Sequence, residues 1–168
     1  VIPFFLEKKA SGILPVTDKR MTRFSITLQQ AVEFVLKCLE MMHGGELFVP
    51  KIPSYKIVDV AKAIAPDARI EYVGIRPGEK LHEVMIPEDE ARNSLEFESH
   101  FVIQPNFPWW TKEQSLLGTG GKSCEDGYCY SSDRNTDWLS IEDIKSLVLQ
   151  LGKEKPPTKI VSAMPISE

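Results

Sequence analysis

The strongest periodic pattern in the sequence lies at 28–42, LQQAVEFVLKCLEMM, where apolar residues recur at the spacing of one helix face. In front of it, Thr27 and Gln30 have the spacing of a capping box, and a Gly-Gly pair at 44–45 supplies a stop behind it. The sequence therefore predicts an amphipathic helix whose apolar face is buried, with the two methionines at its end filling the core. The predicted face consists of Val32, Val35, Leu36, Leu39 and Met42.

Other apolar stretches predict further helices that alternate with strands. Residues 54–66 have a helical apolar face between a capping Ser54 and Pro66, and residues 140–151 have one behind a Ser140–Asp143 cap. The first residues, VIPFFLEKKASG, are typical of the start of a helix that faces a ligand. Residues 13–27 are expected to begin as a strand and to continue into a loop. Further strands are expected at 46–50, 69–74 and 100–105. This alternation predicts an α/β fold rather than a bundle of helices.

Length and composition fit one folded unit. The chain has 168 residues, of which 42% are hydrophobic and 26% charged, so a packed core is expected over 1–151. Residues 106–132 are expected to form a long irregular segment, and 152–168 a tail in which Pro156-Pro157 blocks helix extension. The sequence lacks an initiator methionine, so we expect it to begin inside a longer protein.

Charge and hydropathy argue against several classes of partner. The formal net charge of −4 is spread without long runs of one sign, which argues against binding to nucleic acid or to an anionic membrane surface. No apolar stretch of about 18 residues is present, so no membrane-spanning segment is expected, and no signal peptide is recognisable. The composition is typical of a cytoplasmic protein, in which Cys124 and Cys129 are not expected to form a disulfide. Two cysteines without a neighbouring histidine are also too few for a metal site.

Several nucleotide-binding and catalytic motifs are incomplete or missing. GTGGKS at 118–123 is similar to a phosphate loop, but Leu116 stands where that motif needs its first glycine. No G-x-G-x-x-G follows a strand, no tyrosine is followed four residues later by lysine, and no H-E-x-x-H occurs. His82, between Glu79 and Glu83, could act as a base, but a surface histidine in a charged turn is the preferred interpretation. The sequence therefore offers no catalytic residue.

Two arginine-bearing stretches remain as candidates for anion binding. DKRMTRF at 18–24 carries Arg20 and Arg23 beside a threonine hydroxyl. RPGEK at 76–80 sets Arg76 and Glu79 on either side of a Pro-Gly pair that fixes a tight turn. An arginine presents a planar fork to phosphate oxygens, and a glutamate can accept hydrogen bonds from ribose hydroxyls. On the residues alone, a nucleotide site and a surface turn with an internal ion pair are equally supported.

Five blocks of the sequence resemble the C-terminal half of the inverting UDP-N-acetylglucosamine 4,6-dehydratases, which belong to the extended short-chain dehydrogenase/reductases. The blocks keep the family's order and cover about residues 1–151, whereas TKEQSLLGTGGKSCEDGYC matches least and the tail does not match. The matching blocks are VIPFF, PVTDKRMTRFSITLQQAVEFVL, MHGGELFVPKIPSYKIVDVAKAIAP, GIRPGEKLHEVMIPEDEA and YSSDRNTDWLS.

The resemblance implies which residues meet the substrate. In that family VIPFF lines the UDP-sugar pocket, and RMTRF lies along the nucleotide. The arginine of RPGEK faces the diphosphate, its glutamate approaches the ribose, and YSSxxNTxWL returns near the substrate. In this sequence the implied substrate-binding residues are Val1, Ile2, Pro3, Phe4, Phe5, Met21, Thr22, Arg23, Arg76, Glu79, Asn135 and Thr136.

The resemblance also implies an activity and a division of labour. The family enzyme removes hydride from sugar C4, eliminates water across C5 and C6, and returns hydride to C6 with inversion at C5, using NADP, on the way to pseudaminic acid and related bacterial surface sugars. Its glycine turn and its catalytic Tyr and Lys lie in the N-terminal half, and none of them is in this sequence. We therefore expect the C-terminal substrate-binding part of an extended Rossmann-type NAD(P)-binding dehydratase, lacking the N-terminal cofactor half.

Further expectations follow from that assignment. By itself the chain should bind a UDP-sugar but no cofactor, and should be inactive; the full-length enzyme should be a homo-oligomer. A nucleotide-sugar epimerase of the same superfamily and a non-catalytic UDP-sugar-binding module remain as alternatives.

Overall fold

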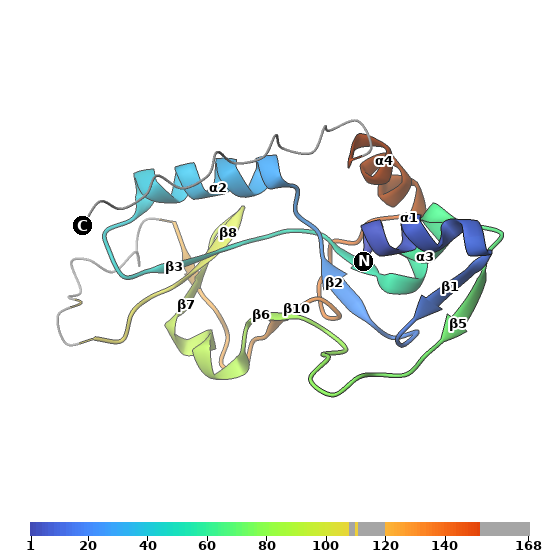
Figure 1. Cartoon of the computed structure of the whole chain (residues 1–168). Helices are drawn as coiled ribbons and strands as arrows, with labels where there is room; N and C mark the ends of the chain where they lie inside the picture. The colour runs from blue at the N-terminus through green and yellow to red at the C-terminus, as the bar shows by residue number, and fades with distance from the viewer. Residues whose placement is uncertain (108–109, 111–119, 152–168) are drawn as a thin grey trace, which may run out of the picture.

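The computed structural model describes residues 1–107, 110 and 120–151, and its elements form two groups along an elongated molecule (Figure 1). The pair β2 (Thr22–Phe24) and β4 (Ser54–Lys56) lies between them. The first group contains α1 (Ile2–Lys8), η1 (Lys9–Ser11), β1 (Ile13–Val16), α3 (Ile57–Ile64), β5 (Arg69–Tyr72) and α4 (Ile141–Leu151). The second contains α2 (Leu28–Met41), β3 (Leu47–Pro50), β6 (Val84–Ile86), η2 (Glu88–Asn93), β7 (Ser94–Glu96), β8 (His100–Ile103), β9 (Lys122–Ser123) and β10 (Tyr130–Ser131).

The first group is built around a parallel strand pair. β1 and β5 run parallel from the pair Ile13–Arg69 to the pair Val16–Tyr72, with α3 between them in the chain. Helix α3 contacts α1, α4 and β1, because its apolar face is buried between them. The core of this group includes the buried residues Phe5, Leu14, Val16, Val60, Ala61 and Ile144.

The second group is an antiparallel sheet with α2 beside it. Its strand order is β3-β8-β7-β9, and all four residues of the central strand β8 are buried. The separate pair β6–β10 completes this group. Its main core cluster contains Val49, Ile86, Phe101, Ile103 and Tyr130, and shares no residue with the core of the first group.

The predicted α/β fold is confirmed, as are its main elements. Helix α2 begins where predicted, with the reciprocal Thr27–Gln30 capping box formed, and the Ser140–Asp143 cap precedes α4. Strands β3, β5 and β8 lie within the segments predicted to be extended. Of the part of the chain that the structure describes, no helix has the length and apolarity needed to cross a bilayer. The predicted tail at 152–168 and most of the predicted irregular segment up to 119 lie outside the described residues.

The capping role predicted for Ser54 is wrong. Helix α3 begins at Ile57 after Lys56, and Ser54 lies in β4, fully buried. Its backbone N–H donates to the Asp137 carbonyl, and its own carbonyl accepts from the Leu139 N–H. The backbone of Ser54 therefore joins β4 to the segment at 137–139, a distant pairing that the local sequence could not indicate.

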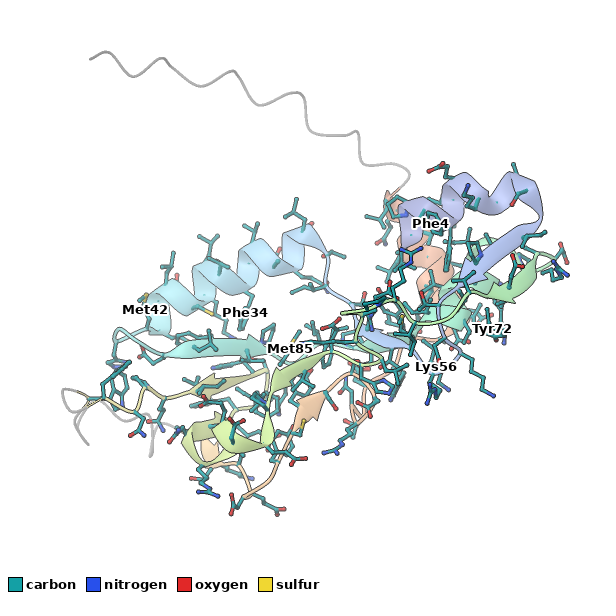
Figure 2. The ribbon with its side chains drawn as sticks, turned by 60° about the horizontal axis from the view of Figure 1, so that its bottom comes forward. Phe4, Phe34, Met42, Lys56, Tyr72 and Met85 are labelled. Carbon is teal, nitrogen blue, oxygen red and sulfur yellow. The ribbon has the colours of Figure 1, made fainter. Side chains whose placement is uncertain are left out.

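The burial predicted for the apolar face of α2 is also wrong. Helix α2 turns a different face toward the sheet: the Phe34 and His100 ring centroids are 6.3 Å apart, and Figure 2 shows Phe34 on the side of the helix facing the strands. Met41, predicted as core, is half-buried. The predicted core residues Val32, Val35, Leu36, Leu39 and Met42 are instead between 48% and 60% exposed.

Candidate functional site

A cavity of about 520 Å³ lies at the carboxyl ends of the parallel strands β1 and β5. Thr17, directly after β1, and Val73, directly after β5, line it, together with Ile57 at the start of α3. In α/β proteins, ligands bind outside the carboxyl ends of parallel strands, and pockets for small molecules have volumes of this order. We call this space the strand-end cavity.

The RPGEK stretch forms a rigid turn on the rim of the strand-end cavity. The Glu79 N–H donates to the Arg76 carbonyl at 3.1 Å, and Gly78, which follows Pro77, has a φ of +84°. Proline followed by a glycine with positive φ is the residue pair that a type II turn requires. The Glu79 Oε2 accepts a hydrogen bond from the Arg76 N–H at 3.1 Å, which closes the turn a second time.

The positive charge of the Arg76 side chain has no partner among the residues that the structure describes. Its side chain is exposed and lines the strand-end cavity, and within the described residues its guanidinium has neither a hydrogen bond nor an ion pair. The Glu79 carboxylate binds the backbone N–H of Arg76, not its guanidinium. The structure therefore does not contain the internal ion pair on which the alternative interpretation of this turn depended.

Arg23 also lines the strand-end cavity, but its donors are already occupied. Its Nη1 donates to the carbonyls of Thr22 and Leu81 at 2.6 and 3.0 Å, and its Nη2 donates to the Lys80 carbonyl at 2.9 Å. Its Nε is 3.3 Å from the Glu83 carboxylate. Arg23 thus holds the segment that follows the Arg76 turn, so its guanidinium is committed to the protein.

Thr22 points to the other side of β2 from Arg23, as neighbouring strand residues do. Its buried hydroxyl lies 2.8 Å from the His82 Nδ1 and 2.7 Å from the Ser132 hydroxyl, which also accepts from the Glu83 N–H at 2.9 Å. Thr22 and His82 line a different hollow from Arg76. This network holds the same 80–83 segment from a second side, and it gives the half-buried His82 a structural partner.

Arg20, the remaining candidate cation, is paired within its own loop. Its Nε and Nη2 donate to the two carboxylate oxygens of Asp18 at 3.0 and 2.8 Å. These hydrogen bonds lower the pKa of Asp18 to about 2. Arg20 lies with His82 and Thr22 on the second hollow, not on the strand-end cavity.

The predicted substrate-binding residues divide between several places. Ile2 packs against the first core, Pro3 is exposed in the first turn of α1, and Thr22 lies in the network described above. Asn135 and Thr136 line a separate cavity of about 340 Å³, where the Asn135 side chain donates to the Ile52 carbonyl and the Ser54 hydroxyl. The strand-end cavity brings together Val1, Phe4, Phe5, Met21, Arg23, Arg76 and Glu79.

Four lining residues were missed by reasoning from the sequence. They are Pro15, Thr17, Ile57 and Val73. Their common feature is position, at or just after β1 and β5 and at the start of α3. That position was available from the predicted strands, since the carboxyl ends of parallel strands are where such sites form. The part of the chain described by the structure contains no group of three or more His, Cys, Asp or Glu residues able to hold a metal ion.

Comparison with known proteins places this geometry in a family. Residues 1–105 match the model of the family described as polysaccharide biosynthesis protein. The chain is 45% identical over 154 residues to the inverting UDP-N-acetylglucosamine 4,6-dehydratase of Campylobacter jejuni, covering 88% of this chain and 46% of that protein. It is 32% identical over 165 residues to the UDP-glucose 4-epimerase of Rickettsia conorii, covering 90% and 45%.

A solved structure agrees with the sequence comparison. The X-ray structure of Pen from Bacillus thuringiensis superposes with a TM-score of 0.72 at 28% identity, over 90% of this chain and 46% of that one. The chain thus spans about half the length of the curated relatives that it matches. Since the family model covers more than half of the chain and a close relative covers most of it, the chain belongs to the polysaccharide biosynthesis protein family.

Proposed function

We propose that this chain is the substrate-binding part of an inverting UDP-N-acetylglucosamine 4,6-dehydratase, and that its strand-end cavity holds the UDP group. The observation that carries the proposal is the guanidinium of Arg76, which has no partner among the described residues and extends from a doubly closed turn on the rim of that cavity. The 45% identity to the Campylobacter jejuni dehydratase supports the choice of substrate.

The cavity offers each part of UDP a suitable surface. Arg76 can donate two parallel hydrogen bonds to the diphosphate, because a guanidinium matches the spacing of phosphate oxygens. Glu79 uses one carboxylate oxygen to close the turn, which leaves the other able to accept from a ribose hydroxyl. Phe4, Phe5 and Met21 give the cavity an apolar wall for the uracil or the sugar.

The chemistry of dehydration is assigned to the other half of the family fold. A nicotinamide cofactor, NADP in our proposal, would be held by that other half and would supply the hydride chemistry at C4 and C6 of the sugar. The sequence has no G-x-G-x-x-G motif after a strand to hold that cofactor, so the contribution of this chain in our proposal is to bind and orient the nucleotide sugar. We place the full-length enzyme in the cytoplasm as a homo-oligomer, in the synthesis of pseudaminic acid or a related surface sugar.

A second candidate is a nucleotide-sugar epimerase, favoured by the 32% identity to the Rickettsia conorii protein. The same cavity would then bind the same UDP group, so the two candidates differ only in what happens to the sugar. An assay that measures loss of water from UDP-N-acetylglucosamine by the full-length enzyme separates them. Release of a 6-deoxy-4-keto product supports the dehydratase, and change of configuration at C4 alone supports the epimerase.

The binding proposal is tested by calorimetric titration of UDP into the chain and its Arg76→Ala variant. Loss of a charge-assisted contact should weaken binding by about 1.5–3 kcal/mol, which is roughly a 10- to 150-fold rise in Kd. Arg92→Ala is the matched control, because Arg92 is also an exposed arginine but pairs with Asp126 in the second group. Equal affinity in the wild type and Arg76→Ala, or no binding of UDP by the wild type, would exclude the strand-end cavity as the UDP site.

A turnover assay tests the division of labour. The purified chain, given UDP-N-acetylglucosamine and NADP, should form no product, since it lacks the cofactor turn and the catalytic Tyr and Lys of the family. Product formation by the chain alone would show that it contains a redox centre of its own.

A further inference from the structure

Helix α2 has three distinct faces, and only one of them is covered by the described protein. Ala31, Phe34, Cys38 and Met41 are half-buried beside the sheet, and Gln29, Glu33, Lys37 and Glu40 form a polar face. Between these two faces runs a third, apolar one, which we call the outer stripe. It consists of Leu28, Val32, Val35, Leu36, Leu39 and, directly after the helix, Met42.

The outer stripe is too large and too continuous for ordinary surface residues. Leu28 is 79% exposed, and Ile26, two residues before the helix, is 41% exposed as well. Single exposed apolar residues are common, but contiguous apolar patches on proteins mark places where another surface packs. A helix that is apolar over two of its three faces is typical of a buried position between two layers.

A second feature of the fold indicates the same missing layer. β1 and β5 form a parallel sheet of only two strands within the part of the chain that the structure describes. Parallel strands are normally found in larger sheets covered on both faces, and a strand edge with unpaired N–H and C=O groups invites pairing. Leu6 in α1, which does not line the strand-end cavity, is also an exposed apolar residue of this group.

We propose that the outer stripe of α2 is the surface on which the other half of the family's fold packs. The Campylobacter jejuni and Rickettsia conorii relatives, and the solved structure of Pen, are all about twice as long as the part that matches this chain. A half-protein of that size can cover both the outer stripe and the edge of the β1–β5 sheet. A second copy of this chain docked through α2 would leave the parallel strands at the other end of the molecule with unpaired edges (Figure 1).

The charges around the outer stripe argue against a lipid surface as its occupant. The polar face of α2 carries Glu33 and Glu40 and a single cation, Lys37. Helices that lie on membranes are rich in lysine and arginine on the polar face, which bind anionic lipids. The outer stripe therefore fits a protein layer better than a membrane.

The test is co-expression of this chain with the part of the Campylobacter jejuni dehydratase that lies outside the matched segment. Wild-type chain should co-purify with it as a one-to-one complex, measured by size-exclusion chromatography with light scattering and without any nucleotide. The double variant Leu36→Lys, Leu39→Lys should raise the dissociation constant at least about 100-fold, since each buried leucine is worth roughly tenfold and a lysine in its place must be desolvated. Glu40→Lys, on the polar face of the same helix, is the control and should bind like the wild type.

A fusion of the same two parts into one polypeptide keeps the test decisive if the separate half is insoluble. The double variant should then melt at least several degrees below both the wild-type fusion and the Glu40→Lys fusion, because the outer stripe is buried in it. The proposal is overturned if the double variant assembles and melts like the wild type. It is also overturned if the chain forms a homodimer through the outer stripe that the co-expressed half does not displace. Because no outcome depends on UDP, failure here is distinguishable from failure of the proposed function.

Discussion

Replacing Arg23 by methionine should loosen the segment at 80–83 that follows the Arg76 turn. Methionine keeps the apolar stem of the side chain but has no donors for the carbonyls of Lys80 and Leu81, which Arg23 binds at 2.9 and 3.0 Å. The Thr22 N–H, which donates to the Leu81 carbonyl at 3.0 Å, and the Thr22–His82 contact would then hold the segment with less support.

The size of the effect follows mainly from the two lost hydrogen bonds to the carbonyls of Lys80 and Leu81, because the Glu83 carboxylate that Arg23 also meets is 42% exposed and an ion pair so open to water contributes little. Hydrogen bonds to a charged donor are worth about 1.5–3 kcal/mol each when buried, but the Arg23 side chain is 21% exposed and water can replace part of what is lost. We therefore expect the free energy of local opening to fall by roughly 2–3 kcal/mol in total. At about 1.4 kcal/mol per factor of ten, this corresponds to roughly 30- to 150-fold faster exchange of the amides that depend on the segment.

Hydrogen exchange measured by NMR on the native protein tests this directly. The reporting amides are those of Thr22 and Ser132, which donate to the carbonyls of Leu81 and Glu83, and the control amide is Val73, which donates to the Val16 carbonyl in the first group. Exchange at the first two should accelerate while that of Val73 is unchanged. Unaltered exchange at Thr22 and Ser132 would refute the assignment of Arg23 as the residue that positions this segment.

Three further changes test other parts of the structure. Gly78→Ala should cost the Arg76 turn about 1–2 kcal/mol because its φ is +84°, although the added methyl meets no atom within 4 Å; a Glu79 amide resonance that does not move would contradict this. Tyr130→Phe should lower the free energy of unfolding in urea by about 1–2 kcal/mol, since the hydroxyl accepts from the Ile52 N–H and donates to its carbonyl; no change in the urea midpoint would be the contrary result. Burial, with two nearby lysines, lowers the pKa of His100, so its neutral form is favoured in the fold and stability should fall as the pH drops below about 6.5, the ordinary pKa of histidine in the unfolded chain. His100→Gln should remove that part of the pH dependence, and identical pH profiles in both proteins would argue against it.

Features set by neighbouring residues could be predicted from the sequence. The starts of α2 and α4 follow from caps between residues three apart, and the Arg76 turn follows from the φ of proline and the freedom of glycine. Short strands were missed because a local pattern needs several residues to be recognised. The strands β4, β6, β9 and β10 have two or three residues each, too few to show a period of two. They exist because distant partners pair with them.

The candidate site could be predicted only in part. The sequence proposed Arg20, Arg23 and Arg76 as cations for an anion site, and nothing in their neighbours distinguished them. The structure separates them by their partners. Arg20 is held by Asp18 two residues away, Arg23 by carbonyls 57 and 58 residues away, and only the guanidinium of Arg76 has no partner among the described residues.

The sequence by itself determined where α2 and α4 begin, that the fold alternates helices and strands, and that residues 76–79 form a stiff turn, because capping and backbone preferences act over a few neighbouring residues. Tertiary structure alone decided which face of α2 is buried and which of the three candidate arginines has no partner for its side chain among the described residues. Periodicity shows that a helix has an apolar face but not what lies against it, because burial depends on surfaces that other, distant segments bring to it.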